Sequence, residues 1–168
     1  MKKAGAFTLV EVLIVVTLLG VLAGIVIPSI SSGSASAQSS ALAQDLKLLR
    51  RFVLIYKIQH LEVGPGYLNG STSADPVEEV FINQAIMASN ASGQTDVAGT
   101  SGYNRGPYLE RMPVNPFNGK STVQMLGNSE NFPADADDSH GWIYKAATSE
   151  LRADNAGTNI NGKRYYDY

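Results

Sequence analysis

A long apolar run near the N-terminus constrains this chain more than any other feature of its sequence. Residues 7–30 contain a single charged side chain, Glu11. As an α-helix rising about 1.5 Å per residue, the run would extend roughly 36 Å, enough to cross a hydrocarbon core of about 30 Å. Lys2 and Lys3 precede it, and basic residues tend to remain in the cytoplasm. We therefore predict one membrane-spanning helix with its N-terminus in the cytoplasm and the rest of the chain outside.

Two simpler interpretations of the run are a secretory signal peptide and an uncleaved signal anchor. Residues 35–37 fit a small-x-small cleavage site, and cleavage there would release a soluble product, such as an exported enzyme, that begins at Gln38. The apolar segment of a signal peptide is only about 7–15 residues long, so this run is too long for one. An uncleaved anchor would tether a binding or adhesion module. Neither interpretation accounts for a carboxylate so early in the apolar run.

Glu11 needs a partner if it enters a membrane. A charge deep in a bilayer costs about 2.5–3.5 kcal/mol on insertion scales, and less near a helix end that reaches the interface. The apolar segment itself offers no partner. A free α-amino group on a neighbouring chain would remove the penalty, and cleavage directly before Phe7 would create such an amine.

The N-terminal residues resemble the class III signal of type IV prepilins and type II secretion pseudopilins. The resemblance rests on two early lysines, a small residue, the sequence FTLVE at residues 7–11 and the apolar helix that follows. In that family a membrane peptidase cuts before the first apolar residue, the new N-terminus is methylated, and the glutamate pairs with the amine of a neighbouring subunit. The resemblance thus implies cleavage between Ala6 and Phe7, methylation of Phe7 and a register-setting charge at Glu11.

The residue before the cut departs from the family pattern. The family usually has glycine there, whereas this chain has Ala6, with Gly5 one position earlier. Cleavage after Gly5 would restore the glycine but would move Glu11 out of its usual spacing. Alanine for glycine is the smaller departure, so cleavage after Ala6 is favoured and cleavage after Gly5 stays open.

Gly20 and Pro28 interrupt the apolar run. In a helix, glycine costs about 1 kcal/mol relative to alanine, and proline removes a backbone hydrogen bond. Both residue types are also common in membrane helices, where they need no special role. In pilin-like families a stretch at similar positions unwinds inside the fibre, so the resemblance makes residues 20–28 a candidate for local melting.

A second helical pattern follows a Ser/Ala/Gly-rich patch at residues 29–40. Apolar residues then recur at helical spacing, with charged residues on the other faces, at Leu42, Leu46, Leu49, Val53 and Tyr56. This pattern predicts an amphipathic helix packed on a core, and one helix can continue through the patch. The Gly64-Pro65-Gly66 cluster predicts where that helix ends.

The remaining chain predicts a short helix and a small sheet. Asp75, Pro76 and Glu78 match a capping pattern for a helix that runs to about residue 89. The polar, glycine-rich stretch after that helix predicts a loop. The expected strands are residues 121–126, a hairpin of residues 141–146 and 149–153, and a last strand or an ordered tail at residues 163–168.

The C-terminal half adds to the resemblance. The sequence GPYLERMPVNPFNGKSTV at residues 106–123 and the sequence GWIYKAATSELRADN at residues 141–155 are similar to the C-terminal region of major secretion pseudopilins. The family has an α+β type IV pilin fold, in which a short helix and a small antiparallel β-sheet pack on a long N-terminal helix with a membrane half and an amphipathic half. The implied organisation is a leader at residues 1–6, a membrane and fibre-core helix at residues 7–30, and an amphipathic continuation with a soluble domain at residues 31–168.

Catalysis and nucleic-acid binding find little support. The chain has no cysteine, which removes disulfides, thiolate zinc sites and cysteine nucleophiles. A formal net charge of −2 provides no basic footprint for nucleic acid. The two histidines, His60 and His140, stand in no recognisable catalytic motif and are expected to be solvated. We therefore expect a structural subunit and not an enzyme.

The acidic run Asp135, Asp137 and Asp138 is the one candidate metal site. Calcium takes six to eight oxygen ligands, which loop carboxylates and carbonyls supply. The resemblance also implies calcium, because major pseudopilins often hold this ion in their C-terminal loops. The run lacks EF-hand spacing and a distal glutamate, so a solvated loop is the competing interpretation.

The resemblance further implies partners and a location. Such a subunit is processed by a prepilin peptidase and methyltransferase and is held in the inner membrane. An inner-membrane assembly platform then passes it into a periplasmic or extracellular filament with copies of itself and other pseudopilins. The resemblance favours a secretion pseudopilus over an adhesive or motility pilus. Glu11→Ala should matter little for a mere tether but should block assembly of a pilin.

Overall fold

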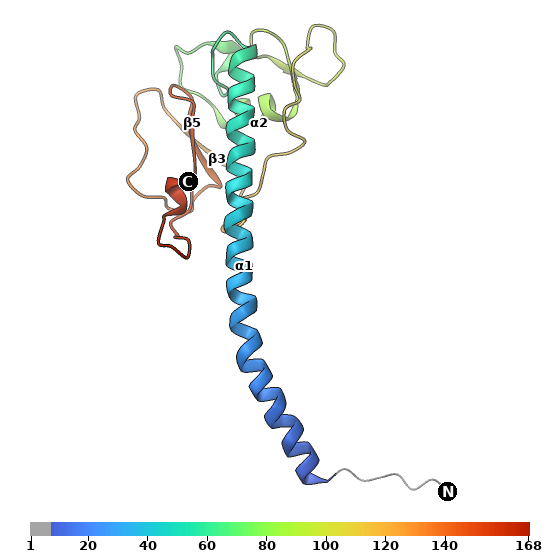
Figure 1. Ribbon diagram of the computed structural model, residues 1–168. Coiled ribbons are helices and arrows are strands. Elements are labelled where there is room, and N and C mark those ends of the chain that lie inside the picture. Colours follow the sequence, from blue (N-terminus) through green and yellow to red (C-terminus); the bar gives the residue numbers. More distant parts are fainter. Residues whose placement is uncertain (1–7) are drawn as a thin grey trace, which may run out of the picture. The chain divides into compact units, whose positions relative to one another are not determined.

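The computed structural model describes residues 8–168, apart from the side chains of residues 24–32. The chain divides into two compact units, residues 1–37 and residues 38–168, and each is considered by itself. One helix, α1 (Leu9–Gln59), contributes to both units (Figure 1). It continues through the Ser/Ala/Gly-rich patch at residues 29–40, which confirms the predicted continuation.

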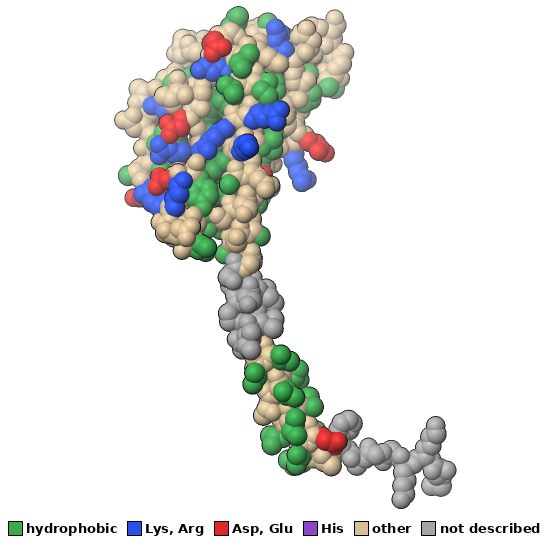
Figure 2. Space-filling model, viewed as in Figure 1, with side chains coloured by type: hydrophobic (Ala, Val, Ile, Leu, Met, Phe, Trp, Pro, Cys, Tyr) green, Lys and Arg blue, Asp and Glu red, His purple; other side chains and the backbone are tan. Residues whose placement is uncertain are grey.

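In the first unit, α1 exposes apolar side chains on all of its faces. Figure 2 shows these side chains along the N-terminal part of the helix. They are 52–82% exposed at Leu9, Val10, Val12, Leu13, Ile14, Val15, Val16, Leu18, Leu19, Val21 and Leu22. A helix that is apolar all round is normally buried in a large core or in a membrane. Among the described residues, this segment therefore presents an apolar surface that its own unit does not cover.

The predicted membrane span at residues 7–30 falls partly outside the described residues, which omit residue 7 and the side chains of residues 24–30. Within the described part of the chain, no helix has a stretch long and apolar enough to cross a membrane.

In the second unit, α1 forms one wall of the core. The predicted stripe is buried, with at most 2% exposure at Leu42, Leu46, Leu49, Val53 and Tyr56. Phe52, also on α1, packs edge-on against Phe81 at 5.4 Å between ring centroids and against Tyr56 at 6.0 Å. The stripe therefore finds its apolar partners within its own chain.

α1 ends earlier than predicted. It stops at Gln59, before the Gly64-Pro65-Gly66 cluster. Leu61 and Glu62 adopt positive φ angles of 56° and 63°, a left-handed conformation in which a helix cannot continue. A 3-10 turn, η1 (Leu68–Gly70), follows.

The predicted capping pattern of the second helix is wrong. α2 (Glu78–Ile86) begins with Val77 as its N-cap, without a side-chain cap. The Asp75 carboxylate accepts a hydrogen bond from the Asn128 backbone N–H at 2.8 Å instead. The Glu78 carboxylate accepts one from the Val123 backbone N–H at 2.7 Å. Distant backbone donors thus compete successfully for both carboxylates.

The end of α2 and the loop after it also differ from the prediction. The helix stops at Ile86, short of residue 89, because the chain turns into a strand. This strand, β1 (Ala88–Ser89), pairs in antiparallel fashion with β2 (Thr95–Asp96), which lies in the segment predicted as a loop.

The main sheet has the order β3-β4-β5. Its strands are β3 (Val123–Leu126), β4 (Trp142–Lys145) and β5 (Glu150–Ala153). The β4–β5 pair is the predicted antiparallel hairpin, but β3 and β4 run parallel, with Val123 opposite Trp142. The sheet is therefore mixed and not purely antiparallel. Parallel neighbours need a long connection, which residues 127–141 supply and which we name the crossover loop.

The C-terminal residues form an ordered tail. They contain a 3-10 turn, η2 (Tyr165–Asp167), and not a strand. Tyr165 and Tyr166 are 5% and 3% exposed, so their rings close the domain.

Candidate assembly segment and C-terminal loop

α1 begins with a reciprocal pair of hydrogen bonds between Thr8 and Glu11. The Glu11 carboxylate accepts the Thr8 backbone N–H and the Thr8 hydroxyl, each at 2.8 Å. In return, the Glu11 N–H donates to the Thr8 hydroxyl oxygen at 3.2 Å. This is a capping box, and its T-x-x-E spacing is visible in the sequence. The expectation that the segment offers Glu11 no partner is therefore wrong.

The cap does not exhaust the Glu11 carboxylate. A carboxylate has about four lone-pair sites, and Thr8 fills two of them. The carboxylate is exposed at the helix N-terminus, where the helix dipole also favours a negative charge. Glu11 can thus cap its own helix and still receive an ammonium group from another molecule.

The other N-terminal predictions concern residues that the structure describes only in part. Ala6 and Phe7 lie outside the described residues, so cleavage and methylation there stay predictions. α1 is helical from Gly20 to Pro28, although the side chain of Pro28 lies outside the described part. A Cβ atom at Gly20 would meet no described atom within 4 Å. No packing contact with the described residues therefore requires the glycine, and local melting in a fibre stays a prediction.

The three aspartates of the acidic run each engage the protein separately. Asp135 forms an exposed ion pair with Arg164 at 3.0 Å. The Asp138 carboxylate accepts a hydrogen bond from the Asn155 side-chain amide at 3.1 Å. Asp137 accepts one from the Ser139 N–H at 3.0 Å, and hydrogen bonding by Ser139 lowers the pKa of Asp137.

These contacts direct the three carboxylates to different protein groups. Among the described residues, no group of three or more acidic, histidine or cysteine side chains is placed to hold a metal ion. The acidic run therefore does not fit a calcium ion.

A buried carboxylate organises the same loop. Asp154 follows β5 and is fully buried. One of its oxygens accepts the N–H groups of Asp137 and Asp138 at 3.0 and 3.1 Å. The other accepts the His140 N–H at 2.8 Å and the Ser139 hydroxyl at 3.3 Å. Its position after a predicted strand gave no sign of this role, because its partners come from a distant loop.

His60 is buried and not solvated as predicted. It is 3% exposed and stacks on Tyr56 at 3.8 Å between ring centroids. Its Nδ1 lies 2.8 Å from the Tyr56 carbonyl oxygen, so Nδ1 donates, and Nε2 lies 3.0 Å from the Ser89 hydroxyl. Burial is the main cause that lowers the pKa of His60, and the Arg105 charge acts in the same direction. His140, in contrast, is partly exposed.

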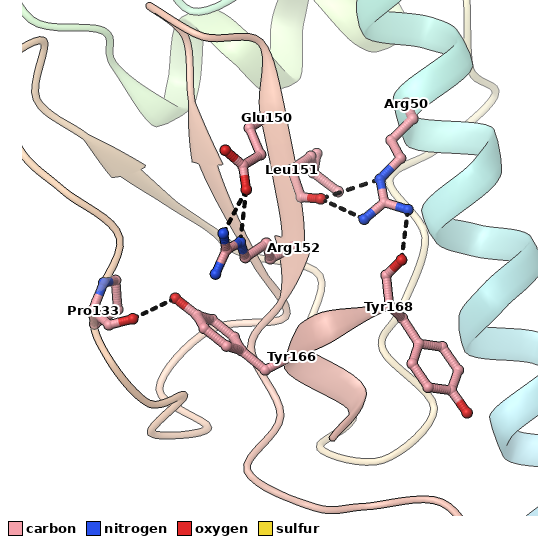
Figure 3. Close-up of polar contacts among 7 residues, drawn as sticks. All are labelled: Arg50, Pro133, Glu150, Leu151, Arg152, Tyr166 and Tyr168. Carbon is pink, nitrogen blue, oxygen red and sulfur yellow. Dashed lines mark hydrogen bonds and ion pairs between the residues drawn. The ribbon is translucent and has the colours of Figure 1, made fainter. Parts of the chain in front are cut away.

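Arg50 joins α1 to the C-terminal part of the second unit. Figure 3 shows its guanidinium group between Leu151 of β5 and Tyr168. It donates to the Leu151 carbonyl oxygen at 2.9 and 3.2 Å and to the Tyr168 backbone oxygen at 3.1 Å. A planar, forked donor suits such a double contact. The same view shows the Tyr166 hydroxyl donating to the Pro133 carbonyl oxygen, at 2.7 Å, which attaches the tail to the crossover loop.

Together, these features resemble those of one class of protein. A long N-terminal helix has an exposed apolar first part and a buried amphipathic second part, with α2 and a small sheet packed on it. A family profile described as "Prokaryotic N-terminal methylation motif" matches residues 1–27. The chain is therefore similar to type IV pilin-like proteins, and its first residues match their N-terminal methylation motif.

Within this class, the chain is similar to proteins named type II secretion system core protein G. It is 25% identical to that of Klebsiella pneumoniae over 135 residues, which cover 80% of this chain and 83% of the relative. The relative from Aeromonas hydrophila is 23% identical and covers 74% of each chain. That of Vibrio cholerae is 25% identical over 70% of this chain and 68% of its own length. No solved structure matches the chain significantly.

Proposed function

We propose that the chain is a structural subunit of a type II secretion pseudopilus or a related type IV pilus-like filament, and not an enzyme. The observation that carries this proposal is the exposed apolar surface of α1 at residues 9–22, which lies within the matched methylation motif. The similarity to secretion core protein G over most of the chain supports the same function.

The processing steps follow from the motif. A prepilin peptidase would remove residues 1–6 by cutting between Ala6 and Phe7, and a methyltransferase would modify Phe7. The subunit would reside in the inner membrane through residues 7–30, with its domain outside the cytoplasm. An inner-membrane assembly platform would then pass it to a periplasmic or extracellular filament with other pseudopilins.

The assembled helices would form the fibre core. In this filament, the apolar side chains of residues 9–22 cover one another, and the Glu11 carboxylate receives the new α-amino group of a neighbouring copy. The contact joins different surfaces of identical subunits, so it repeats without closing and produces a filament in place of a ring. Residues 20–28 would supply the stretch that unwinds during packing.

The capping box provides a sharp test of the pairing charge. Glu11→Gln retains the T-x-x-Q version of the capping box but removes the charge. Thr8→Ala retains the charge but removes the cap, and Glu11→Ala removes both. We expect Glu11→Gln to abolish filament formation and secretion in the native host almost as completely as Glu11→Ala. Thr8→Ala should be the mildest of the three.

Two results bear on different parts of this assignment. Filaments of Glu11→Gln at the wild-type level would reduce Glu11 to a helix cap and overturn its pairing role, but not the role of the chain as a filament subunit. Mass spectrometry of the mature N-terminus supplies the second test. A methylated Phe7 supports the pilin-like function, whereas a chain beginning at Met1 would favour the tethered binding module, and a start at Gln38 would favour a secreted protein.

A further inference from the structure

The crossover loop directs backbone N–H groups onto a carboxylate of its own chain. Three N–H groups and one hydroxyl of residues 137–140 converge on Asp154. Successive N–H groups of this kind form a concave nest that binds an anion. Asp138 has a φ of 58°, the left-handed conformation that turns a loop in this way. The inner side of the loop therefore presents positive N–H groups. A calcium site presents negative oxygen atoms instead.

The Asp154 carboxylate has no remaining capacity for a cation. A carboxylate offers about four lone-pair sites, and four donors fill them. The group is fully buried, so it depends on these donors for compensation. Asp154 thus cannot serve as a calcium ligand without losing hydrogen bonds that offset its desolvation.

Side-chain cations occupy the outward-facing oxygens of the loop. The Lys120 ammonium group donates to the carbonyl oxygens of Asp138 and Ser139 at 2.8 and 3.0 Å. Arg164 donates to the Ala134 carbonyl oxygen and to the Asp135 carboxylate, each at 3.0 Å. Loop carbonyls and carboxylates are the ligands that calcium takes in proteins. Here two protein-borne cations already neutralise them.

Phe132, nearer the middle of the crossover loop, is attached separately. The Arg152 guanidinium group of β5 lies 4.3 Å from the centroid of the Phe132 ring and 5.0 Å from that of Tyr166. Glu150 holds the same guanidinium group through contacts at 2.6 and 2.8 Å, as Figure 3 shows. The loop is thereby held around its middle and near its end by groups of the same domain.

We infer that built-in charges replace a structural calcium ion in this domain: Asp154 inside the crossover loop, and Lys120 and Arg164 on its outer side. The domain therefore keeps its fold and stability without calcium, and a filament built from it does not depend on calcium for subunit stability. This inference rests on contacts inside one domain, so it stands or falls independently of the proposed function.

The test is thermal unfolding of the purified full-length chain in detergent. Trp142 is the only tryptophan and is fully buried, so its fluorescence reports on the domain core. We expect the same Tm in excess EGTA and in millimolar calcium. A calcium-dependent rise in Tm of several degrees, or stoichiometric calcium binding in a calorimetric titration of the wild-type chain, would overturn the inference.

A matched pair of variants tests the nest itself. Asp154→Asn places an amide NH₂ among N–H donors and should lower the Tm by about 5–10 °C, with no recovery on addition of calcium. Asp135→Asn, at an exposed carboxylate, should change the Tm by only about 1 °C. An unchanged Tm for Asp154→Asn would refute the role of the nest. If Asp154→Asn does not fold, Lys120→Met supplies a milder loss, and the wild-type calcium titration still decides the question.

Discussion

The two parts of α1 present the same kind of side chain to opposite environments. Leu13, in the first unit, is 58% exposed, whereas Leu46, in the second, is 1% exposed. Burying one leucine side chain stabilises by about 1.5–3 kcal/mol, so this difference is large. The second part obtains this stabilisation from its own domain. The first part does not obtain it within its own unit, and for this reason the proposed assembly function is placed there.

The largest expected effect is a loss of filament assembly when a charge is introduced into the first part of α1. Val16→Asp should abolish filament assembly, because a carboxylate on the helix cannot be covered by apolar neighbours. The unfolding of the domain should not change. Val97→Asp is the matched control, since Val97 is a similarly exposed valine of the domain at 68% against 60% for Val16. Electron microscopy of filaments together with the Tm would decide, and normal filaments of Val16→Asp would contradict the comparison.

The next largest effect is a loss of domain stability when an apolar side chain is shortened in the second part of α1. Leu46→Ala should lower the free energy of unfolding by about 2–5 kcal/mol, the usual range for a fully buried leucine. Leu13→Ala, the same substitution on the same helix, should leave it unchanged. Chemical denaturation of the full-length chain in detergent, followed by Trp142 fluorescence, measures both. An equal loss in the two variants would mean that the first part also packs on the domain.

A smaller effect is expected where α1 meets β5. Arg50→Met keeps the aliphatic stem but removes the donors to Leu151 and Tyr168, and should cost about 1 kcal/mol because the guanidinium group is partly solvated. Arg51→Met is the control, as Arg51 is an exposed neighbour on the same helix. Denaturation midpoints that fall equally in both variants would argue against a specific role for Arg50.

The smallest effect is a pH dependence from His60. Its pKa in the folded domain lies below its usual value, so the unfolded chain binds more protons. Stability is therefore complete above the unfolded value of about 6.5 and declines as the pH falls from there through the folded pKa. His60→Gln should flatten this part of the profile. Stability profiles that remain parallel for wild type and His60→Gln between pH 7 and pH 5 would exclude the effect.

Features with a short repeat could be predicted from the sequence. The spacing of Leu42, Leu46 and Leu49 indicated the buried face of α1, and the β4–β5 hairpin followed from two short strands close in sequence. The T-x-x-E capping box of Thr8 and Glu11 is equally local, but the prediction that Glu11 has no partner in the segment missed it. These patterns depend on neighbours within one or two turns of the chain, so no knowledge of the fold was needed.

Features that join distant segments could not be predicted in this way. Asp75 and Glu78 match a helix cap, yet backbone groups of Asn128 and Val123 take both carboxylates. His60 carries no sequence mark of burial, because its cover comes partly from Ser89 and its strand. In both cases the residue that makes the contact lies far away along the chain, so a pattern of neighbouring residues cannot reveal it.

The sequence by itself determined that this protein has a long apolar helix with one early carboxylate and an amphipathic continuation, because helical periodicity and charge are properties of adjacent residues. Only the tertiary structure decided that β3 pairs in parallel with β4 and that Asp154, rather than the acidic run, organises the crossover loop. The physical reason is that a buried polar group is satisfied by whichever donors the fold brings to it, and their distance along the chain does not matter.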